Sequence, residues 1–355
     1  MLVANFLSAT RGSRSVMEDL ADRLRDAGNP TVCVSHYRSG WLRGLHLAST
    51  ALRRRQDYDL AVVDLYSGRA FRWGEVAAGL LRALGCPFVF VLRGGGLPGF
   101  GERHPSRVRR CLRKADAVAA PSAFLLEGMR PYRDDLRMLP NPLDIPKYEF
   151  RLRAPPQPKL IWLRAFQKHY NPTMALQVLA RLSPEFPGLH LSMVGPDKGD
   201  GTRQQAERTA AELGVAGRLT LPGGVAKQEV PGWLNRGDIF LNTTNVDNTP
   251  VSVLEAMACG LCVVSTNVGG IPHLVEHEKE ALLVPRDDPA AMADAVRRLL
   301  TERELAARLS QNGRSKVEQF DWSVVMPQWE ALLHSVARAF SGSRRNPRID
   351  SCPSE

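Results

Sequence analysis

Apolar and polar residues follow one another along the chain in blocks that predict strand, helix, strand, helix. Short apolar runs predict strands, and longer stretches with apolar residues three or four positions apart predict helices. In the first part, strands are expected at 2–7, 31–35, 59–64, 87–92 and 117–120, and helices at 15–27, 73–84 and from about 122. Because strands that alternate with helices build parallel sheets covered by helices, we expect an α/β fold.

The alternation starts again after a proline-rich, linker-like segment at 152–159. Here the expected strands are 159–163, 190–194, 219–221 and 239–241, and the expected helices are 172–182 and 203–213. The pattern predicts two tandem Rossmann-like, doubly wound domains, 1–150 and 151–322, that face each other across a cleft. A helix around 329–339, within the segment 323–340, is expected to cross back to the first domain. The polar tail 341–355 is expected to be disordered.

Length and composition narrow the class of protein. A chain of 355 residues exceeds the usual size of one hydrophobic core, and 44% hydrophobic with 24% charged residues is typical of globular proteins. No stretch reaches the roughly 20 apolar residues of a membrane helix, and the apolar start favours a buried strand over a signal peptide. The six cysteines show no metal-binding spacing, and Cys259 and Cys262 are best explained as small core residues. Reduced thiols and a cytoplasmic location are therefore expected.

Positive charge is concentrated in the first 150 residues. They hold 23 Lys or Arg against 15 Asp or Glu, which accounts for +8 of the overall +10. Basic clusters at 53–55 and 107–114, with an apolar and basic helical stretch at 41–48, suit contact with an anionic membrane at its inner face, or simply a solvated helix face. Nucleic-acid binding is not expected, because no aromatic residues are interleaved with these clusters and no binding module is recognisable.

Residues 247–272 are the most informative segment. They predict a loop, a short capped helix, a glycine turn, a buried strand and a second glycine turn. Thr249 is the expected N-cap and Pro250 the expected first helical residue. The first-turn amides of Val251 and Ser252 would then be free to bind an anion such as a diphosphate.

Two carboxylates flank this expected anion site. Asp247 lies just before the helix, and Glu255 falls in its second turn. Carboxylates beside a phosphate site suggest chemistry on a nucleotide-activated sugar.

The second half contains an ordered series of short motifs. They are Leu-Ile-Trp-Leu-Arg164, Met-Val-Gly195-Pro, Leu-Pro-Gly-Gly224-Val225, Gly237-Asp238-Ile-Phe-Leu, Glu255-Ala-Met-Ala-Cys-Gly260, Val-Val-Ser-Thr-Asn-Val-Gly269-Gly270-Ile-Pro and Ala-Leu-Leu-Val284-Pro. This order of motifs resembles the family-4 retaining glycosyltransferases of the GT-B fold (glycosyl transferases group 1). A looser resemblance in the first half rests on residues 115–122 and 139–144, and together they cover the chain from residue 2 to about 336.

The resemblance implies a role for each donor-site residue. Glu255 would accept hydrogen bonds from the nucleotide ribose, and Asp247 would approach the sugar hydroxyls from a position where glutamate is usual. Arg164 would neutralise the diphosphate, with Lys168 as a second cation at a spacing one residue shorter than usual. Further donor contacts are expected from the glycine-containing turns, the base resting on Gly224 and Val225, and from the loop and helix start: Gly195, Gly224, Val225, Thr249, Pro250, Val251 and Ser252.

The first half departs from the family after the strand 87–92. Many relatives have a histidine there, whereas this chain has Arg93 followed by three glycines. Arg93 could bind a sugar hydroxyl, a phosphate or an acidic acceptor, or be a surface residue of a flexible loop. Gly12, in the Arg-Gly-Ser turn at 11–13, could face the diphosphate.

The resulting expectation is transfer of a hexose from UDP- or GDP-hexose to an acceptor hydroxyl, with retained configuration. It needs no cofactor and no metal, and the basic first half favours an acidic, lipid-linked or saccharide acceptor. A sugar-nucleotide epimerase, a phosphorylase-like enzyme and a non-catalytic sugar-binding protein remain alternatives.

Overall fold

The computed structural model describes residues 1–4, 15–34 and 40–345 of the chain. Contacts divide it into two compact units, each described here by itself. The N-terminal unit comprises Met1–Pro121, Leu126–Leu139 and Met326–Glu355; the C-terminal unit comprises Ser122–Leu125 and Pro140–Val325. The predicted turn at 11–13, with Gly12, and the cysteine at 352 lie outside the described residues.

The C-terminal unit begins earlier than the sequence predicts. Its first residue after the crossover is Pro140, not residue 151. Leu143, Ile145 and Tyr148 are buried in the apolar core of this unit, which is why the segment before the proline-rich stretch belongs to it.

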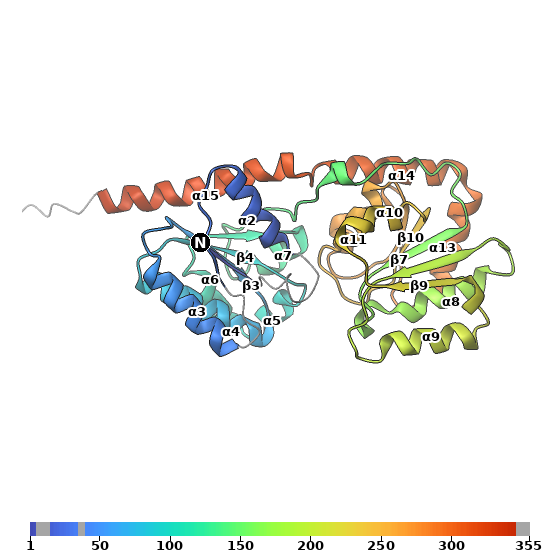
Figure 1. Ribbon diagram of the computed structural model, residues 1–355, viewed down its shortest axis with the longest axis horizontal. Helices are drawn as coiled ribbons and strands as arrows, with labels where there is room; N and C mark the ends of the chain where they lie inside the picture. Colours follow the sequence, from blue (N-terminus) through green and yellow to red (C-terminus); the bar gives the residue numbers. More distant parts are fainter. Residues whose placement is uncertain (5–14, 35–39, 346–355) are drawn as a thin grey trace, which may run out of the picture. The chain divides into compact units, whose positions relative to one another are not determined.

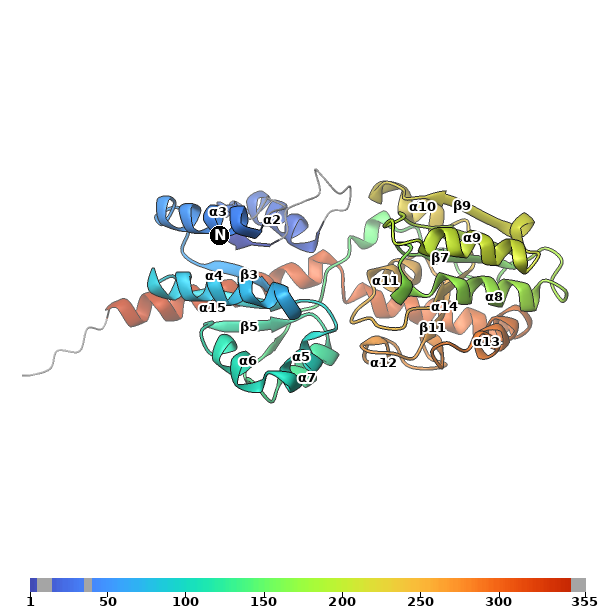
Figure 2. The ribbon, with the colours of Figure 1, turned by 90° about the horizontal axis from the view of Figure 1, so that it is seen from below.

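The N-terminal unit is built on a six-stranded parallel sheet in the order β2-β1-β3-β4-β5-β6, with helices on its two faces (Figures 1 and 2). This confirms the expected α/β architecture. The strands are β1 (Leu2–Val3), β2 (Cys33–Val34), β3 (Ala61–Leu65), β4 (Phe88–Leu92), β5 (Ala117–Ala120) and β6 (Arg137–Met138). The helices are α2 (Val16–Asp26), α3 (Gly40–Arg53), η1 (Gly68–Ala70), α4 (Phe71–Ala83), α5 (Leu97–Arg103) and α6 (Pro105–Leu112). Helix α7 (Ala123–Met129) is divided between the two units and belongs to this one from Leu126.

The C-terminal unit contains a second six-stranded parallel sheet, in the order β12-β11-β10-β7-β8-β9. Counted from β7, this is the order 6-5-4-1-2-3 of the dinucleotide-binding fold. Its strands are β7 (Lys159–Leu163), β8 (His190–Val194), β9 (Leu219–Gly223), β10 (Ile239–Asn242), β11 (Cys262–Thr266) and β12 (Ala281–Val284). Its helices are η2 (Ile145–Lys147), η3 (Lys168–Tyr170), α8 (Pro172–Leu182), α9 (Thr202–Glu212), η4 (Ala216–Arg218), η5 (Lys227–Glu229), α10 (Val230–Leu234), α11 (Val251–Ala258), α12 (Ile271–Leu274), α13 (Pro289–Thr301) and α14 (Arg303–Glu318).

Alternate residues of a strand point to opposite faces of the sheet. Since helices cover both faces of the second sheet, the residues on both faces are apolar. On β7, Leu160 and Trp162 join the core under α8, α9 and α13, whereas Ile161 joins the core under α10 and α11. Figure 1 shows these helix groups on opposite faces of the sheet. Burial on both sides explains why the strands are nearly continuous apolar runs in the sequence.

The last helix, α15 (Trp322–Arg345), begins in the C-terminal unit and continues in the N-terminal unit from Met326. The expectation of disorder is wrong for residues 341–345, which are helical. Once a helix is formed, each added residue gains a backbone hydrogen bond, so a polar end can extend it. Residues 346–355 lie outside the described residues.

Candidate active site

The order of the second sheet reverses between β7 and β10, so the loops that follow these two strands leave in opposite directions. Ligands of doubly wound sheets bind in the crevice at such a point, at the carboxyl ends of the strands. Arg164 follows β7 directly, and Asp247 lies in the loop after β10. The topology therefore brings these two predicted residues to one edge of the sheet.

Arg164 and Asp247 form an ion pair in which Arg164 Nη2 donates to Asp247 Oδ2. Only 15% and 14% of the two side chains is exposed. The guanidinium also lies over the Tyr170 ring, 4.8 Å from its centroid. Arg164 Nε is buried without a hydrogen-bond partner among the described residues. Arg164 thus retains a donor that a bound anion could use.

The loop that carries Asp247 is held by the second glycine turn. A Cβ on Gly269 would lie 2.1 Å from the carbonyl oxygen of Asp247, and one on Gly270 would lie 1.9 Å from that of Asn248. Gly269 has a φ of +54°, and the Gly270 amide donates to the Asp247 carbonyl over 3.0 Å. Only glycine allows this approach, so the turn at 269–270 positions the carboxylate loop.

Helix α11 starts one residue later than expected. Pro250, with φ −68° and ψ 110°, is the N-cap, and the helix begins at Val251, so the prediction of Thr249 as N-cap is wrong. Because the extended ψ of Pro250 keeps it out of the helix, its carbonyl oxygen accepts the first bond, from the Val253 amide at 3.0 Å.

This start leaves several hydrogen-bond donors unused. The hydroxyls of Thr249 and Ser252 are buried and have no partner among the described residues. The first-turn amides of Val251 and Ser252 have no intrahelical acceptor. Hydroxyls and amides at the positive end of a helix are suited to a phosphate.

Glu255, in the second turn of α11, is 7% exposed and accepts a hydrogen bond of 2.8 Å from the Tyr148 hydroxyl. Burial raises the pKa of the Glu255 carboxyl, while the Tyr148 hydrogen bond and the charges of Lys227 and Arg164 act in the opposite direction. Burial and the neighbouring Glu255 raise the pKa of Tyr148, so this phenol stays protonated and donates.

Tyr148 and Lys227 are site residues that sequence reasoning missed. Tyr148 ends the turn η2 and lies 107 residues before Glu255 in the chain, so no local pattern links them. Lys227 begins η5, two residues after the predicted base-binding pair Gly224 and Val225. Its position in a motif-bearing loop was a signal that could have identified it.

The other predicted donor residues have different surroundings. Lys168 is exposed at the start of η3. A Cβ on Gly195 would lie 1.6 Å from the Arg164 carbonyl oxygen, so this glycine lets the loop after β8 pack against the Arg164 backbone. Gly224 is exposed and Val225 is partly buried against the core.

Arg93 belongs to the N-terminal unit, where its Nε donates to Asp64 Oδ1 over 2.8 Å. The side chains are 11% and 6% exposed. Burial raises the pKa of Asp64, and the Arg93 charge partly offsets this effect. The arginine that stands in place of the family's histidine is thus held by a carboxylate of the neighbouring strand.

Comparison with known proteins identifies the C-terminal unit. Residues 144–316 match the family described as glycosyl transferases group 1. This segment is a glycosyl transferases group 1 domain. The resemblance to glycosyl transferases group 1 is confirmed for this segment, and Arg164, Asp247, Glu255, Tyr148 and Lys227 all lie within it.

Two curated relatives illustrate what the chain is similar to. The GDP-mannose-dependent alpha-(1-6)-phosphatidylinositol monomannoside mannosyltransferase of Mycobacterium tuberculosis (strain CDC 1551 / Oshkosh) is 28% identical over 64% of this chain and 58% of its own length. The D-inositol 3-phosphate glycosyltransferase of Frankia alni is 24% identical over 88% of this chain and 86% of its own. The match thus covers less than two thirds of the mycobacterial relative.

Solved structures similar to the chain confirm the GT-B fold. The sucrose-phosphate synthase of Thermosynechococcus elongatus has a TM-score of 0.77 at 17% identity, over 95% of this chain and 98% of its own. Anabaena HepE in complex with UDP and glucose has a TM-score of 0.74 at 16% identity, over 94% and 98%. Among the described residues, no helix is long and apolar enough to cross a membrane.

Proposed function

We propose that this chain transfers a hexose from a nucleoside diphosphate sugar to an acceptor hydroxyl with retained anomeric configuration. The observation that carries the proposal is the convergence of Arg164, the unused donors at the start of α11 and the buried Glu255 at one sheet edge. A cation and helix amides suit a diphosphate, and a buried carboxylate suits the ribose hydroxyls.

Each residue has a proposed task in donor binding. Arg164 and the donors of Thr249, Val251 and Ser252 hold the diphosphate, with Lys168 as a further cation. Glu255 accepts a hydrogen bond from the ribose. The Tyr148 hydroxyl donates to one carboxylate oxygen of Glu255, so that the other oxygen points to the nucleotide. The base rests on the segment around Gly224 and Val225, next to Lys227.

Asp247 acts on the sugar after Arg164 has turned toward the phosphates. The ion pair in the free protein keeps both side chains in place and neutralises each of them. When the diphosphate binds, Arg164 gains a more strongly charged partner, and Asp247 becomes available to the sugar hydroxyls.

In the proposed reaction, the acceptor hydroxyl attacks the anomeric carbon from the face that the diphosphate leaves. The bond from this carbon to the phosphate oxygen breaks, a new carbon–oxygen bond forms, and the hydroxyl proton passes to the leaving diphosphate. Arg164 and the α11 amides stabilise the charge that develops on the diphosphate. This step requires no cofactor.

The relatives suggest the class of donor and acceptor for this chain. One uses GDP-mannose on a phosphatidylinositol monomannoside, and others are inositol 3-phosphate glycosyltransferases. A UDP- or GDP-hexose and an acidic, lipid-linked or saccharide acceptor fit the basic N-terminal half of this chain, which would act in the cytoplasm at the membrane surface. The relatives are named as transferases, which favours transfer over epimerisation, phosphorolysis or mere sugar binding.

A donor screen tests the proposal. Calorimetry of the full chain with UDP, GDP and their hexose conjugates should find one nucleotide that binds at micromolar concentration. Glu255→Ala should weaken that binding at least tenfold, whereas the matched control Glu304→Ala, an exposed residue of α14, should leave it unchanged. Wild-type affinity in Glu255→Ala would refute the proposed donor site.

A further inference from the structure

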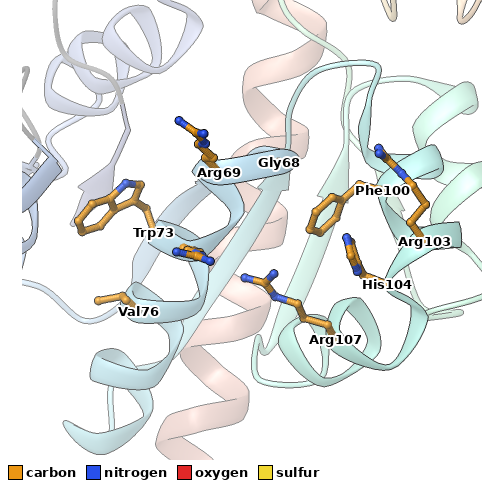
Figure 3. Close-up of a pocket in the computed structure, with 9 residues that line it drawn as sticks. Gly68, Arg69, Trp73, Val76, Phe100, Arg103, His104 and Arg107 are labelled. Atoms are coloured by element: carbon orange, nitrogen blue, oxygen red, sulfur yellow. The ribbon is translucent and has the colours of Figure 1, made fainter.

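An open pocket of about 940 Å³ lies in the N-terminal unit. Its lining residues fall between Gly68 and Arg107, and none of them is a predicted donor residue. One wall comes from η1 and the start of α4, with Arg69 and Trp73, and the opposite wall comes from α5 and α6, with Arg103 and Arg107 (Figure 3). We call it the arginine pocket. Its lining includes the cationic or titratable residues Arg69, Arg72, Arg103, His104 and Arg107 and no acidic residue.

Part of this positive charge is matched by Glu75, whose carboxyl pKa is lowered by the hydrogen bond from Arg107 and by the charges of Arg107 and Arg72. In the part of the chain that the structure describes, Arg69, Arg72 and Arg103 form no ion pair; Arg103 Nε donates only to the Gly99 carbonyl, over 2.9 Å. Arg107 differs, because its Nε donates to the Glu75 carboxylate over 2.8 Å. Three exposed guanidinium groups around one pocket repel each other unless an anion joins them.

The arginine pocket also has an apolar part. The Phe100 ring is 4.7 Å from the His104 ring, and the Arg107 guanidinium lies 5.9 Å from the Phe100 centroid. At the rim, Trp73 and Val76 are 39% and 51% exposed. A ligand that meets both parts carries an anionic group next to carbon-rich surface.

The place of the arginine pocket in the fold supports a binding role. The turn η1 follows β3 and helix α5 follows β4, so both walls begin at the carboxyl ends of strands. The order of this sheet reverses next to β3, between β3 and β1, which marks the usual ligand edge. A Cβ on Gly96 would lie 2.9 Å from the Ser67 hydroxyl oxygen, so this glycine allows the two loops to approach each other.

We infer that the arginine pocket binds the phosphate group of a phosphate ester. Guanidinium groups pair with phosphate oxygens through two parallel hydrogen bonds, and three arginines match the several oxygens of one phosphate. That the ester is the sugar acceptor rests on the proposed function; that the pocket binds phosphate does not. The same chemistry is offered by a free sugar or polyol phosphate and by a phospholipid headgroup.

The test measures binding of two probes to the full chain. Glycerol 3-phosphate represents the free ester, and phosphatidylcholine vesicles with and without phosphatidic acid represent the headgroup. The pocket variant is Arg69→Gln/Arg72→Gln, and the matched control is Arg181→Gln/Arg208→Gln, which removes the same charge from exposed positions of α8 and α9. Arg103→Gln is a second pocket variant, and circular dichroism verifies that each variant folds.

We expect the pocket variants to weaken binding of at least one probe about tenfold or more, and the control to change it less than twofold. Loss of glycerol 3-phosphate binding identifies a free ester, and loss of phosphatidic-acid-dependent vesicle binding alone identifies a headgroup. Equal losses in pocket variant and control, or no binding of either probe to the wild type, would overturn the inference.

Two further measurements separate this inference from the proposed function. Phosphate probes could occupy the donor site, so they are titrated also into Arg164→Gln; loss of binding there with none in the pocket variants would overturn the inference. Nucleoside diphosphate binding is measured on every variant. The pocket variants should retain it, and a wild type that binds the phosphate ester but no nucleotide would refute only the proposed function.

Discussion

Each unit holds a largely buried arginine–aspartate pair at the carboxyl edge of its sheet, and the two pairs differ in how they are supported. In the N-terminal unit, Arg93 follows β4 and its partner Asp64 lies on the adjacent strand β3. In the C-terminal unit, Arg164 follows β7 and its partner Asp247 lies on a loop. The first carboxylate is fixed by the sheet, whereas the second depends on a glycine turn.

The difference suggests different roles for two pairs of the same composition. A pair between neighbouring strands cannot separate without disturbing the sheet, so the Arg93 pair stabilises its unit. The loop position of Asp247 and the unused Nε of Arg164 leave the second pair able to exchange partners when an anion arrives. The shared composition of the two pairs is therefore a poor guide to their function.

The largest effect expected is on stability. Asp64→Ala leaves the buried Arg93 without its counter-charge and should lower the unfolding free energy of the N-terminal unit by about 3–5 kcal/mol. Asp247→Ala should cost only about 1 kcal/mol in the C-terminal unit, because Arg164 can turn toward solvent. Urea denaturation of both variants checks this, and equal losses would show that the two pairs have the same role.

In catalysis, by contrast, the larger effect is expected from the pair in the C-terminal unit. Arg164→Gln removes the cation that faces the leaving diphosphate and should lower kcat about 100-fold to 1,000-fold, by analogy with loss of one oxyanion donor. Arg164→Lys keeps the charge and should recover part of this loss. The measurement is steady-state transfer from the donor that the screen identifies; an Arg164→Gln enzyme with wild-type kcat would contradict the assigned role.

A smaller change is expected for the carboxylate that holds the nucleotide. Glu255→Gln keeps the size of the side chain but removes its charge, so nucleotide affinity should fall by about 1.5–3 kcal/mol, the range for hydrogen bonds to charged groups. Calorimetry of the variant measures this, with Glu304→Gln as the matched exposed control.

The smallest effect concerns Tyr148, and it depends on pH. Tyr148→Phe removes one hydrogen bond and should weaken nucleotide binding by about 0.5–1.5 kcal/mol at neutral pH. Because burial raises the pKa of Glu255, binding in the wild type should be lost, as the pH falls, at a higher pH than an ordinary carboxyl would give. The Tyr148 hydrogen bond lowers that pKa, so Tyr148→Phe should move the loss to still higher pH. An unchanged pH profile would show that Tyr148 does not act through Glu255.

The sequence predicted most of the fold because its elements have local causes. Strands β5, β7 and β8 and helix α8 have the bounds expected from apolar runs and helical spacing. Errors occurred where neighbouring residues overrode a local preference. Pro250, and not Thr249, is the N-cap of α11, and α15 continues through polar residues. The segment 140–150 was assigned to the wrong unit because its core contacts are with residues far along the chain.

The candidate site was predicted in part for the same reason. Arg164, Asp247 and Glu255 lie in motifs whose spacing can be recognised in one chain, and the structure brings them to one edge of the second sheet. Tyr148 carries no such signal, because the contact with Glu255 forms only when a turn before the proline-rich segment packs on α11. The arginine pocket likewise has no signal in the sequence, since its residues come from two separate helical segments.

By itself, the sequence determined the two parallel sheets, the short helix after the carboxylate loop and the family of the second domain, because periodicity and motif order are properties of a linear chain. Only the tertiary structure decided which charges meet. Asp247 pairs with Arg164, Asp64 pairs with Arg93, and Arg69, Arg72 and Arg103 surround one pocket without an acid in its lining. Electrostatic energy depends on distances through space and on burial, and the order of residues alone determines neither in a way that can be recognised locally.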